Sequence, residues 1–176
     1  MMKSAHAIGC CAAHALGCCA LLAWTAGSLA QQRPSCAGPQ LGTWILLSME
    51  TEDLETGEKL NLLGAHPGGY LTYDADCRMS AILVKESRRG PSAAVASDME
   101  SIELYRGLIA YAGSYTVDGS TITHHIEASW NQAWTGTTRV SQFNVDGTSL
   151  FMRTGPDKSP MTGRQSATLF IWTRVE

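Results

Sequence analysis

The sequence predicts an all-β protein, a small antiparallel barrel with one short helix. Short β-rich segments separated by turn signals recur from residue 41 almost to the C-terminus. Two Asp-Gly pairs stand between such segments, as in tight hairpins, and only one segment has a helical pattern. Strands of this number and length suit a closed barrel, because closure removes unpaired edges. A β-sandwich is the alternative arrangement.

The first thirty residues have the pattern of a secretory signal peptide. Lys3 is their only charged residue, an apolar run covers 7–24, and Ser28-Leu29-Ala30 ends in small residues. A membrane anchor would need about 20 predominantly apolar residues, and two glycines and a histidine interrupt this run. We therefore expect cleavage after Ala30 and export to the periplasm or the exterior.

The next ten residues, 31–40, are rich in Gln, Pro and Gly and predict a disordered tail before a barrel domain at 41–176. Cleavage after Ala30 would remove four of the six cysteines and leave Cys36 and Cys77. In an oxidising compartment these two could form one disulfide. Their spacing equally allows two free thiols.

Composition excludes several classes of protein. The hydrophobic fraction is 44% and the net charge is −3, which argues against intrinsic disorder. The net negative charge does not favour binding to nucleic acid, nor to an anionic membrane surface once the signal peptide is removed. The chain has no C-x-x-C, G-x-S-x-G or phosphate-binding glycine motif, so we expect neither a cofactor nor a metal.

Each expected strand is a run rich in β-branched or aromatic residues that ends at a turn signal. In chain order the strands are Thr43–Glu50, Gly69–Asp74, Arg78–Lys85, Ala112–Val117, Thr121–Ser129, Thr138–Val145, Ser149–Arg153 and Ala167–Arg174.

The expected helix runs from Asp98 to Leu108. Ser97 and Glu100 have the spacing of a capping box, in which each side chain bonds the other's backbone N–H. Apolar residues at 102, 105 and 109 then share one helical face.

The two hairpins fix which side chains face inward. If Asp118-Gly119 is a two-residue loop with both residues at positive φ, Val117 pairs with Ser120 and the strand faces follow. One face is aromatic and aliphatic, so we expect it to be the interior. It carries Tyr111, Tyr115, Ile122, His124, Ile126 and Trp130, and the same reasoning at Asp146-Gly147 pairs Phe143 with Leu150 and adds Arg139. Such an apolar interior with a few polar groups is typical of a ligand pocket.

Ordered blocks of the sequence resemble the bacterial and fungal lipocalin-like domain family. The resemblance covers about Leu41 to Arg174 and implies a lipocalin-like barrel with a central cavity. Related barrels bind small hydrophobic molecules, and some act as cofactor-free cyclases or isomerases. Trp130–Trp134 lacks the proline of the family's Pro-Asn-Trp type segment, and the resemblance implies no catalytic motif. The blocks are LGTW at 41–44, GGYLTY at 68–73, RMSA at 78–81, YAGSY at 111–115, DG at 118–119, THHIEAS at 123–129 and WTGT at 134–137.

The candidate catalytic residues are His124, His125 and Glu127. Imidazole titrates near neutral pH, and an apolar cavity would keep His124 neutral and able to accept a proton. It could equally be a buried histidine bonded to Tyr111 or Tyr115. His125 and Glu127 share the opposite face as an acid–base pair, and a one-residue register slip would exchange the two faces. His125 and Glu127 could alternatively be two metal ligands with His66 as a distant third, but no third ligand lies nearby in the sequence.

The candidate ligand-binding residues are aromatic, adaptable or able to fix orientation. Arg139 could bind a carboxylate through paired N–H groups or form a salt bridge at the rim. Trp130 and Trp134 could line the mouth or cover the core. The full set is Tyr70, Met79, Tyr111, Tyr115, Trp130, Trp134, Arg139 and Phe143.

These observations favour a secreted barrel that binds a small apolar or aromatic molecule in a central cavity. The alternative is a cofactor-independent isomerase, cyclase or hydratase that uses a cavity histidine as general acid or base. A third possibility is a structural protein whose own side chains fill the barrel. The sequence leaves the ligand and the oligomeric state open.

Overall fold

The structure is a computed structural model that describes residues 36–159 and 161–175. The predicted signal peptide at 1–30 lies outside the described residues. No helix within the described part of the chain is long and apolar enough to cross a membrane.

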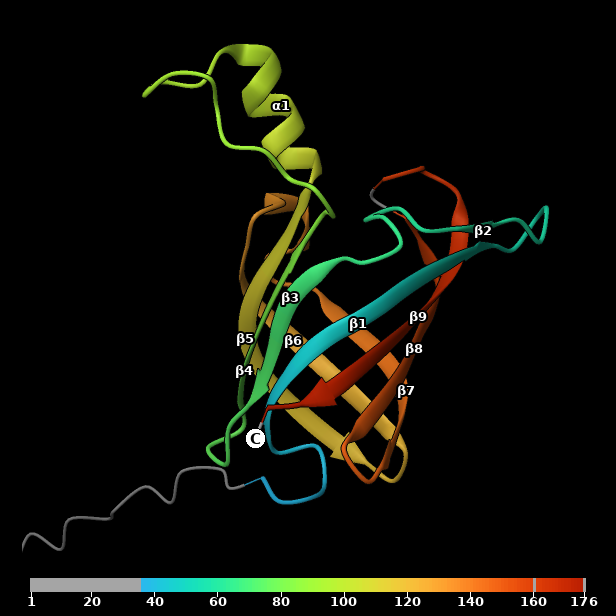
Figure 1. Ribbon diagram of the computed structural model, residues 1–176. Coiled ribbons are helices and arrows are strands. Elements are labelled where there is room, and N and C mark those ends of the chain that lie inside the picture. Colours follow the sequence, from blue (N-terminus) through green and yellow to red (C-terminus); the bar gives the residue numbers. More distant parts are fainter. Residues whose placement is uncertain (1–35, 160, 176) are drawn as a thin grey trace, which may run out of the picture. The chain divides into compact units, whose positions relative to one another are not determined.

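Eight strands form a closed antiparallel barrel (Figure 1). Each strand pairs with its neighbours in chain order, and the first strand of the barrel also pairs with the last, which closes the sheet. A ninth, two-residue strand, β2 (Lys59–Leu60), pairs with the end of β1. The predicted all-β barrel is confirmed, and the sandwich is not found. The barrel strands are β1 (Gly42–Asp53), β3 (Gly68–Tyr73), β4 (Arg78–Val84), β5 (Leu108–Asp118), β6 (Thr121–Ser129), β7 (Thr138–Asp146), β8 (Ser149–Lys158) and β9 (Gln165–Arg174).

The one α-helix of the described residues, α1 (Asp98–Arg106), begins at the predicted capping box of Ser97 and Glu100. It ends two residues earlier than predicted, because β5 begins at Leu108. Ile109, which the helical pattern included, is a strand residue that pairs with Leu83 and is buried in the core. This burial explains the early end, since α1 itself buries no residue. A short 3-10 helix, η1 (Gln132–Trp134), links β6 and β7.

Both hairpin registers differ from the prediction by two residues. Val117 pairs with Ile122, and Val145 pairs with Leu150, so the loops are Gly119-Ser120 and Gly147-Thr148. The predicted Asp-Gly loops are wrong because each aspartate stays in its strand and only the glycine, with φ of 57°, takes a positive value. A hairpin turn with glycine at its first central position needs only that one positive φ. An even shift keeps the side chains of Thr121 to Ile126 on their predicted faces, whereas an irregularity between Ala112 and Gly113 places Ser129 opposite Tyr111.

One end of the barrel is closed by packed side chains and the N-terminal segment. Trp44 is fully buried, donates its indole N–H to the Gln40 carbonyl at 2.8 Å, and has the Arg174 guanidinium 4.1 Å from its ring centroid. A disulfide joins Cys36 to Cys77 in the β3–β4 turn. Residues 36–40 of the predicted tail are thus attached to the barrel. α1 lies at the opposite end (Figure 1).

Candidate functional site

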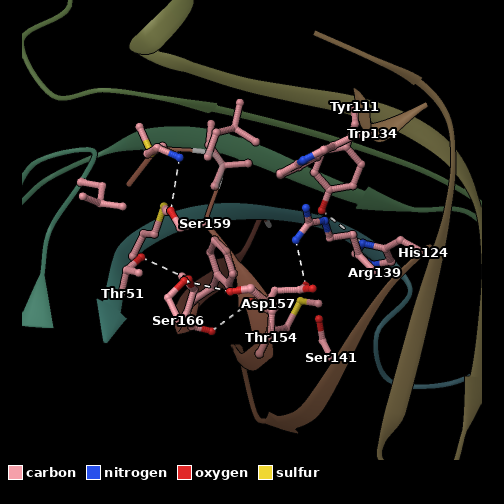
Figure 2. A pocket seen from close by; sticks show the side chains of 18 of the residues that line it. Thr51, Tyr111, His124, Trp134, Arg139, Ser141, Thr154, Asp157, Ser159 and Ser166 are labelled. Carbon is pink, nitrogen blue, oxygen red and sulfur yellow. Dashed lines mark hydrogen bonds and ion pairs between the residues drawn. The ribbon is translucent and has the colours of Figure 1, made fainter. Parts of the chain in front are cut away.

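A partly open cavity of about 80 Å³ lies inside the barrel, away from the closed end. One wall is aliphatic and is formed by Leu71 of β3, Leu83 of β4 and Ile109 of β5. The other walls carry polar side chains. Figure 2 shows Tyr111, Trp134, Arg139 and His124 grouped on one side of the cavity and Thr51, Ser159 and Ser166 on the other.

His124 is the buried titratable residue at the centre of this group. Its side chain points inward from β6, it is 2% exposed, and it lines the cavity. Its Nε2 lies 2.6 Å from the Tyr73 hydroxyl, and its Nδ1 lies 3.2 Å from the Tyr111 hydroxyl. Burial, with a smaller contribution from the neighbouring His125, lowers the pKa of His124 to about 3. The imidazole is therefore neutral at physiological pH.

The two tyrosines are held in their neutral form by the same burial. Desolvation raises the pKa of Tyr111 to about 12 and the pKa of Tyr73 well above its ordinary value. A neutral imidazole has one donor and one acceptor nitrogen, so one tyrosine donates to the ring and the other accepts from it. Tyr73 also reaches the Met152 sulfur at 3.7 Å. Both ring nitrogens of His124 are thus engaged within the barrel.

Arg139 is paired and stacked at the rim of the cavity. It donates to an Asp157 carboxylate oxygen at 2.8 Å, and its guanidinium carbon lies 3.8 Å from the centroid of the Trp134 ring. Its side chain is 18% exposed. Trp134 in turn meets the Tyr111 ring edge-on at 5.8 Å. The arginine therefore fixes the mouth of the cavity rather than offering a free guanidinium.

Three of the eight predicted ligand-binding residues, Tyr111, Trp134 and Arg139, line the cavity. His124, from the predicted catalytic set, also lines the cavity. Met79 and Tyr115 are buried toward the closed end, where the Tyr115 hydroxyl donates to the Asp74 carbonyl.

The remaining ligand-binding predictions are placed outside the cavity. Trp130 packs edge-on against Trp134 at 4.7 Å, and Phe143 is partly buried against the core. Tyr70 is 56% exposed, so its prediction as a wall residue is wrong. Side chains alternate along a strand, and on β3 it is Leu71 and Tyr73 that face inward.

His125 and Glu127 lie on the outer surface of the barrel. Glu127 forms a two-point ion pair with Arg78, at 2.6 and 2.9 Å, and this contact lowers its pKa. The His125 Nε2 lies 3.3 Å from the Thr116 hydroxyl. These two residues are therefore separated from His124 by the sheet. His66 is exposed, and residues 36–159 and 161–175 contain no group of three or more His, Cys, Asp or Glu arranged to hold a metal ion.

Several residues of the site were missed by the sequence reasoning. Tyr73, which contacts His124 but does not line the cavity, could have been found from the alternation of the predicted strand Gly69–Asp74, had its Leu71 face been taken as the inner one. The hydroxyl residues of the opposite wall carry no such signal, because Ser and Thr are equally common on outer faces of strands. They are Thr51, Ser141, Thr154, Ser159, Ser166 and Thr168.

A closed eight-stranded barrel with a cavity at one end defines a small-barrel protein whose interior can hold one small ligand. The sequence model of the lipocalin-like domain matches residues 41–175. The chain belongs to the lipocalin-like domain family, and the resemblance seen in the sequence is confirmed.

Solved structures with a similar fold are distant in sequence. A lipocalin-like protein from Bacteroides uniformis ATCC 8492 is 13% identical, with a TM-score of 0.43, over 78% of this chain and 100% of that one. An uncharacterized protein from Bacteroides eggerthii DSM 20697 is 13% identical, with a TM-score of 0.37, over 77% and 99%. A structure titled REP1-NXSQ fatty acid transporter is 12% identical, with a TM-score of 0.36, over 77% and 96%. A search of curated proteins found no match.

Proposed function

We propose that this protein binds a small apolar or aromatic molecule in the barrel cavity. The observation that carries the proposal is the composition of the cavity wall, where an aliphatic surface faces a small set of converging polar groups. Binding sites for small molecules have this makeup. Burial of apolar ligand surface would supply the affinity, at roughly 25 cal/mol per Å². Tyr111, Trp134 and the Arg139–Asp157 pair would orient the ligand.

Binding is better supported than acid–base catalysis. A general base works best when its pKa lies near the operating pH, whereas burial lowers the pKa of His124 to about 3. Both ring nitrogens are also engaged by tyrosine hydroxyls. His125 and Glu127, the other predicted catalytic residues, lie on the outer face. A cofactor-independent isomerase, cyclase or hydratase would therefore have to act without any of the three predicted catalytic residues as its proton acceptor.

The experiment is native mass spectrometry of the protein expressed from its full sequence, followed by extraction and identification of any retained compound. Thr154→Trp places a large side chain in the cavity, and Arg153→Trp places the same side chain on the outer face of the same strand. We expect a retained small molecule, or a bound apolar fluorescent probe, in the wild type and in Arg153→Trp. We expect neither in Thr154→Trp.

Equal probe binding by both tryptophan variants would place the binding site outside the cavity and contradict the proposal. Absence of any retained compound, together with no probe binding by the wild type, would favour a structural barrel filled by its own side chains.

We also propose that the protein is exported. The signal-like pattern of residues 1–30 supports this, and so does the Cys36–Cys77 disulfide, since such cross-links persist in oxidising compartments. N-terminal sequencing of the protein recovered from the periplasm or the medium should begin at Gln31. Recovery only inside the cell with Met1 or Met2 intact would contradict export.

A further inference from the structure

A row of hydroxyl side chains crosses four neighbouring strands at one level of the barrel. Ser141 of β7 pairs with Thr154 of β8, Thr154 pairs with Thr168 of β9, and Thr168 pairs with Thr51 of β1. All four residues line the cavity. Figure 2 shows Ser141 and Thr154 below the Arg139–Asp157 pair. The cavity therefore has a hydroxyl wall opposite its aliphatic wall.

The hydroxyl groups of this row are not equally engaged. The Thr51 and Thr168 hydroxyls lie 3.1 Å apart, and the Thr154 hydroxyl donates to the Thr168 carbonyl at 3.4 Å. Ser141 is 2% exposed, and its hydroxyl has no hydrogen-bond partner among the described residues. Buried polar groups almost always have partners. Of the four hydroxyls in this row, that of Ser141 therefore alone lacks a hydrogen-bond partner among the described residues.

A second buried donor in the cavity wall is unpaired. Trp172 is 2% exposed, it lines the cavity, and its indole N–H has no partner within the part of the chain that the structure describes. An indole N–H can only donate. A ligand that satisfies it must therefore offer an acceptor atom.

The charged groups of the cavity wall do not favour a ligand with an acidic group at its buried end. Arg139 is already paired with Asp157, and both nitrogens of His124 are bonded to tyrosines. Lys158 lines the cavity but is exposed. A buried carboxylate without a charged partner is strongly disfavoured. The buried donors of the wall that lack a partner among the described residues, Ser141 and Trp172, are neutral, which suits a neutral acceptor.

We propose that the ligand is an uncharged molecule with an apolar body and a carbonyl or hydroxyl oxygen at its buried end, which the Ser141 hydroxyl binds. The apolar body packs on Leu71, Leu83 and Ile109. The Trp172 indole N–H is a second donor for an oxygen atom of the ligand. This inference rests on the proposed binding function and names the chemical class of its ligand.

Three small probes of equal heavy-atom count separate this class from others. Acetophenone carries a neutral carbonyl oxygen, isopropylbenzene replaces that oxygen with a methyl group, and benzoate carries a charge. Their dissociation constants are measured by isothermal titration calorimetry on the full chain and on Ser141→Ala, Trp172→Phe and Ser80→Ala. Ser80 lies on the exposed face of β4 and is the matched control for Ser141.

In the wild type, acetophenone should bind more than tenfold more tightly than benzoate. Ser141→Ala should raise the dissociation constant of acetophenone about tenfold, which corresponds to about 1.4 kcal/mol, and change that of isopropylbenzene less than twofold. Trp172→Phe should also weaken acetophenone more than isopropylbenzene, and Ser80→Ala should change neither. The carbonyl stretching band of bound acetophenone should lie at lower frequency in the wild type than in Ser141→Ala. The free-energy cost of removing each probe from water cancels when the effect of Ser141→Ala on acetophenone is compared with its effect on isopropylbenzene.

The possible failures are distinguishable. If acetophenone and isopropylbenzene both bind but Ser141→Ala affects them equally or not at all, the ligand class is overturned while the binding function stands. Tighter binding of benzoate than of acetophenone also overturns it. If no probe binds, the proposed function fails, and this inference fails with it. Ser141→Ala should fold normally, because it removes a hydroxyl that has no protein partner, and its melting temperature checks this.

Discussion

His124 illustrates how one buried residue is stabilised by its neighbours. The imidazole lies between the Tyr73 and Tyr111 hydroxyls, each of which burial keeps protonated. In these surroundings the charged form of the ring would lose its hydration without gaining a carboxylate as an ion-pair partner. The neutral form, in contrast, satisfies both nitrogens. Loss of hydration on burial, with a smaller contribution from the neighbouring His125, explains the low pKa of His124.

At the residue scale we predict that His124 makes the protein less stable in acid. Its pKa is about 3 in the folded state, against an ordinary value of 6.5. Between these values the unfolded chain binds more protons than the folded protein, so the free energy of unfolding falls as the pH is lowered. The contribution of His124 to the free energy of unfolding is fully present above pH 6.5. Below pH 6.5 the free energy of unfolding falls by up to about 1.4 kcal/mol per pH unit. Urea denaturation at a series of pH values measures this slope.

His124→Gln provides the control because glutamine does not titrate. Asp53, Glu100 and Glu127 also have lowered pKa values, so both proteins lose stability in acid through these carboxylates. The wild type should show the steeper loss between pH 6 and pH 4. Parallel curves for the two proteins would contradict the prediction.

The cavity residues differ in how far the sequence could predict them. Strand alternation and the aromatic face placed Tyr111 and His124 inside correctly, because one face of β6 is clearly more apolar than the other. Tyr70 was chosen over Tyr73 because a strand with a tyrosine on each face gives no such contrast. The lack of a partner for the Ser141 hydroxyl was beyond prediction, since it depends on which groups the neighbouring strands place around it.

At the scale of elements, strand order and strand faces follow from sequence, whereas register depends on turn geometry. An Asp-Gly pair marks a hairpin, but it does not say whether aspartate or glycine takes the first loop position. The error of two residues was harmless to the faces because two is the period of a strand. The helix end was harder to predict, because Ile109 suits a helical face and a buried strand equally well.

The pairing of β5 with β6 contains a bulge, and Gly113 makes it possible. The register shifts between Ala112 and Gly113, which leaves one extra residue on β6. A methyl group added at Gly113 would overlap the His125 carbonyl oxygen. We predict that Gly113→Ala lowers the free energy of unfolding by at least about 2 kcal/mol, because a backbone atom cannot move aside as a side chain can. Urea denaturation measures the loss.

Gly119→Ala separates this overlap from the general cost of replacing a glycine. Gly119 has φ of 57°, and nothing lies within 4 Å of an added methyl group. Only the unfavourable backbone conformation remains, so a loss of about 1 kcal/mol is expected. Equal losses for the two variants would show that the bulge does not require glycine.

At the scale of the whole molecule, barrel closure and the N-terminal disulfide act together. The β1–β9 pairing joins the two ends of the barrel sheet, and the disulfide ties the segment before β1 to the β3–β4 turn. The sequence predicted the closed barrel because eight short strands in one sheet would otherwise expose edges. It left the disulfide open, because only the folded chain brings Cys36 and Cys77 together.

The disulfide should contribute measurably to stability. It closes a loop across a sequence separation of 41 residues, and cross-linking a loop of this length reduces the entropy of the unfolded chain by the equivalent of about 3 to 4 kcal/mol. We predict that the Cys36→Ala, Cys77→Ala double variant unfolds at lower temperature and lower urea concentration than the oxidised wild type. A reductant should lower the melting temperature of the wild type toward that of the variant and leave the variant unchanged. If reduction leaves the wild-type melting temperature unchanged, the attachment of residues 36–40 does not contribute to the stability of the barrel.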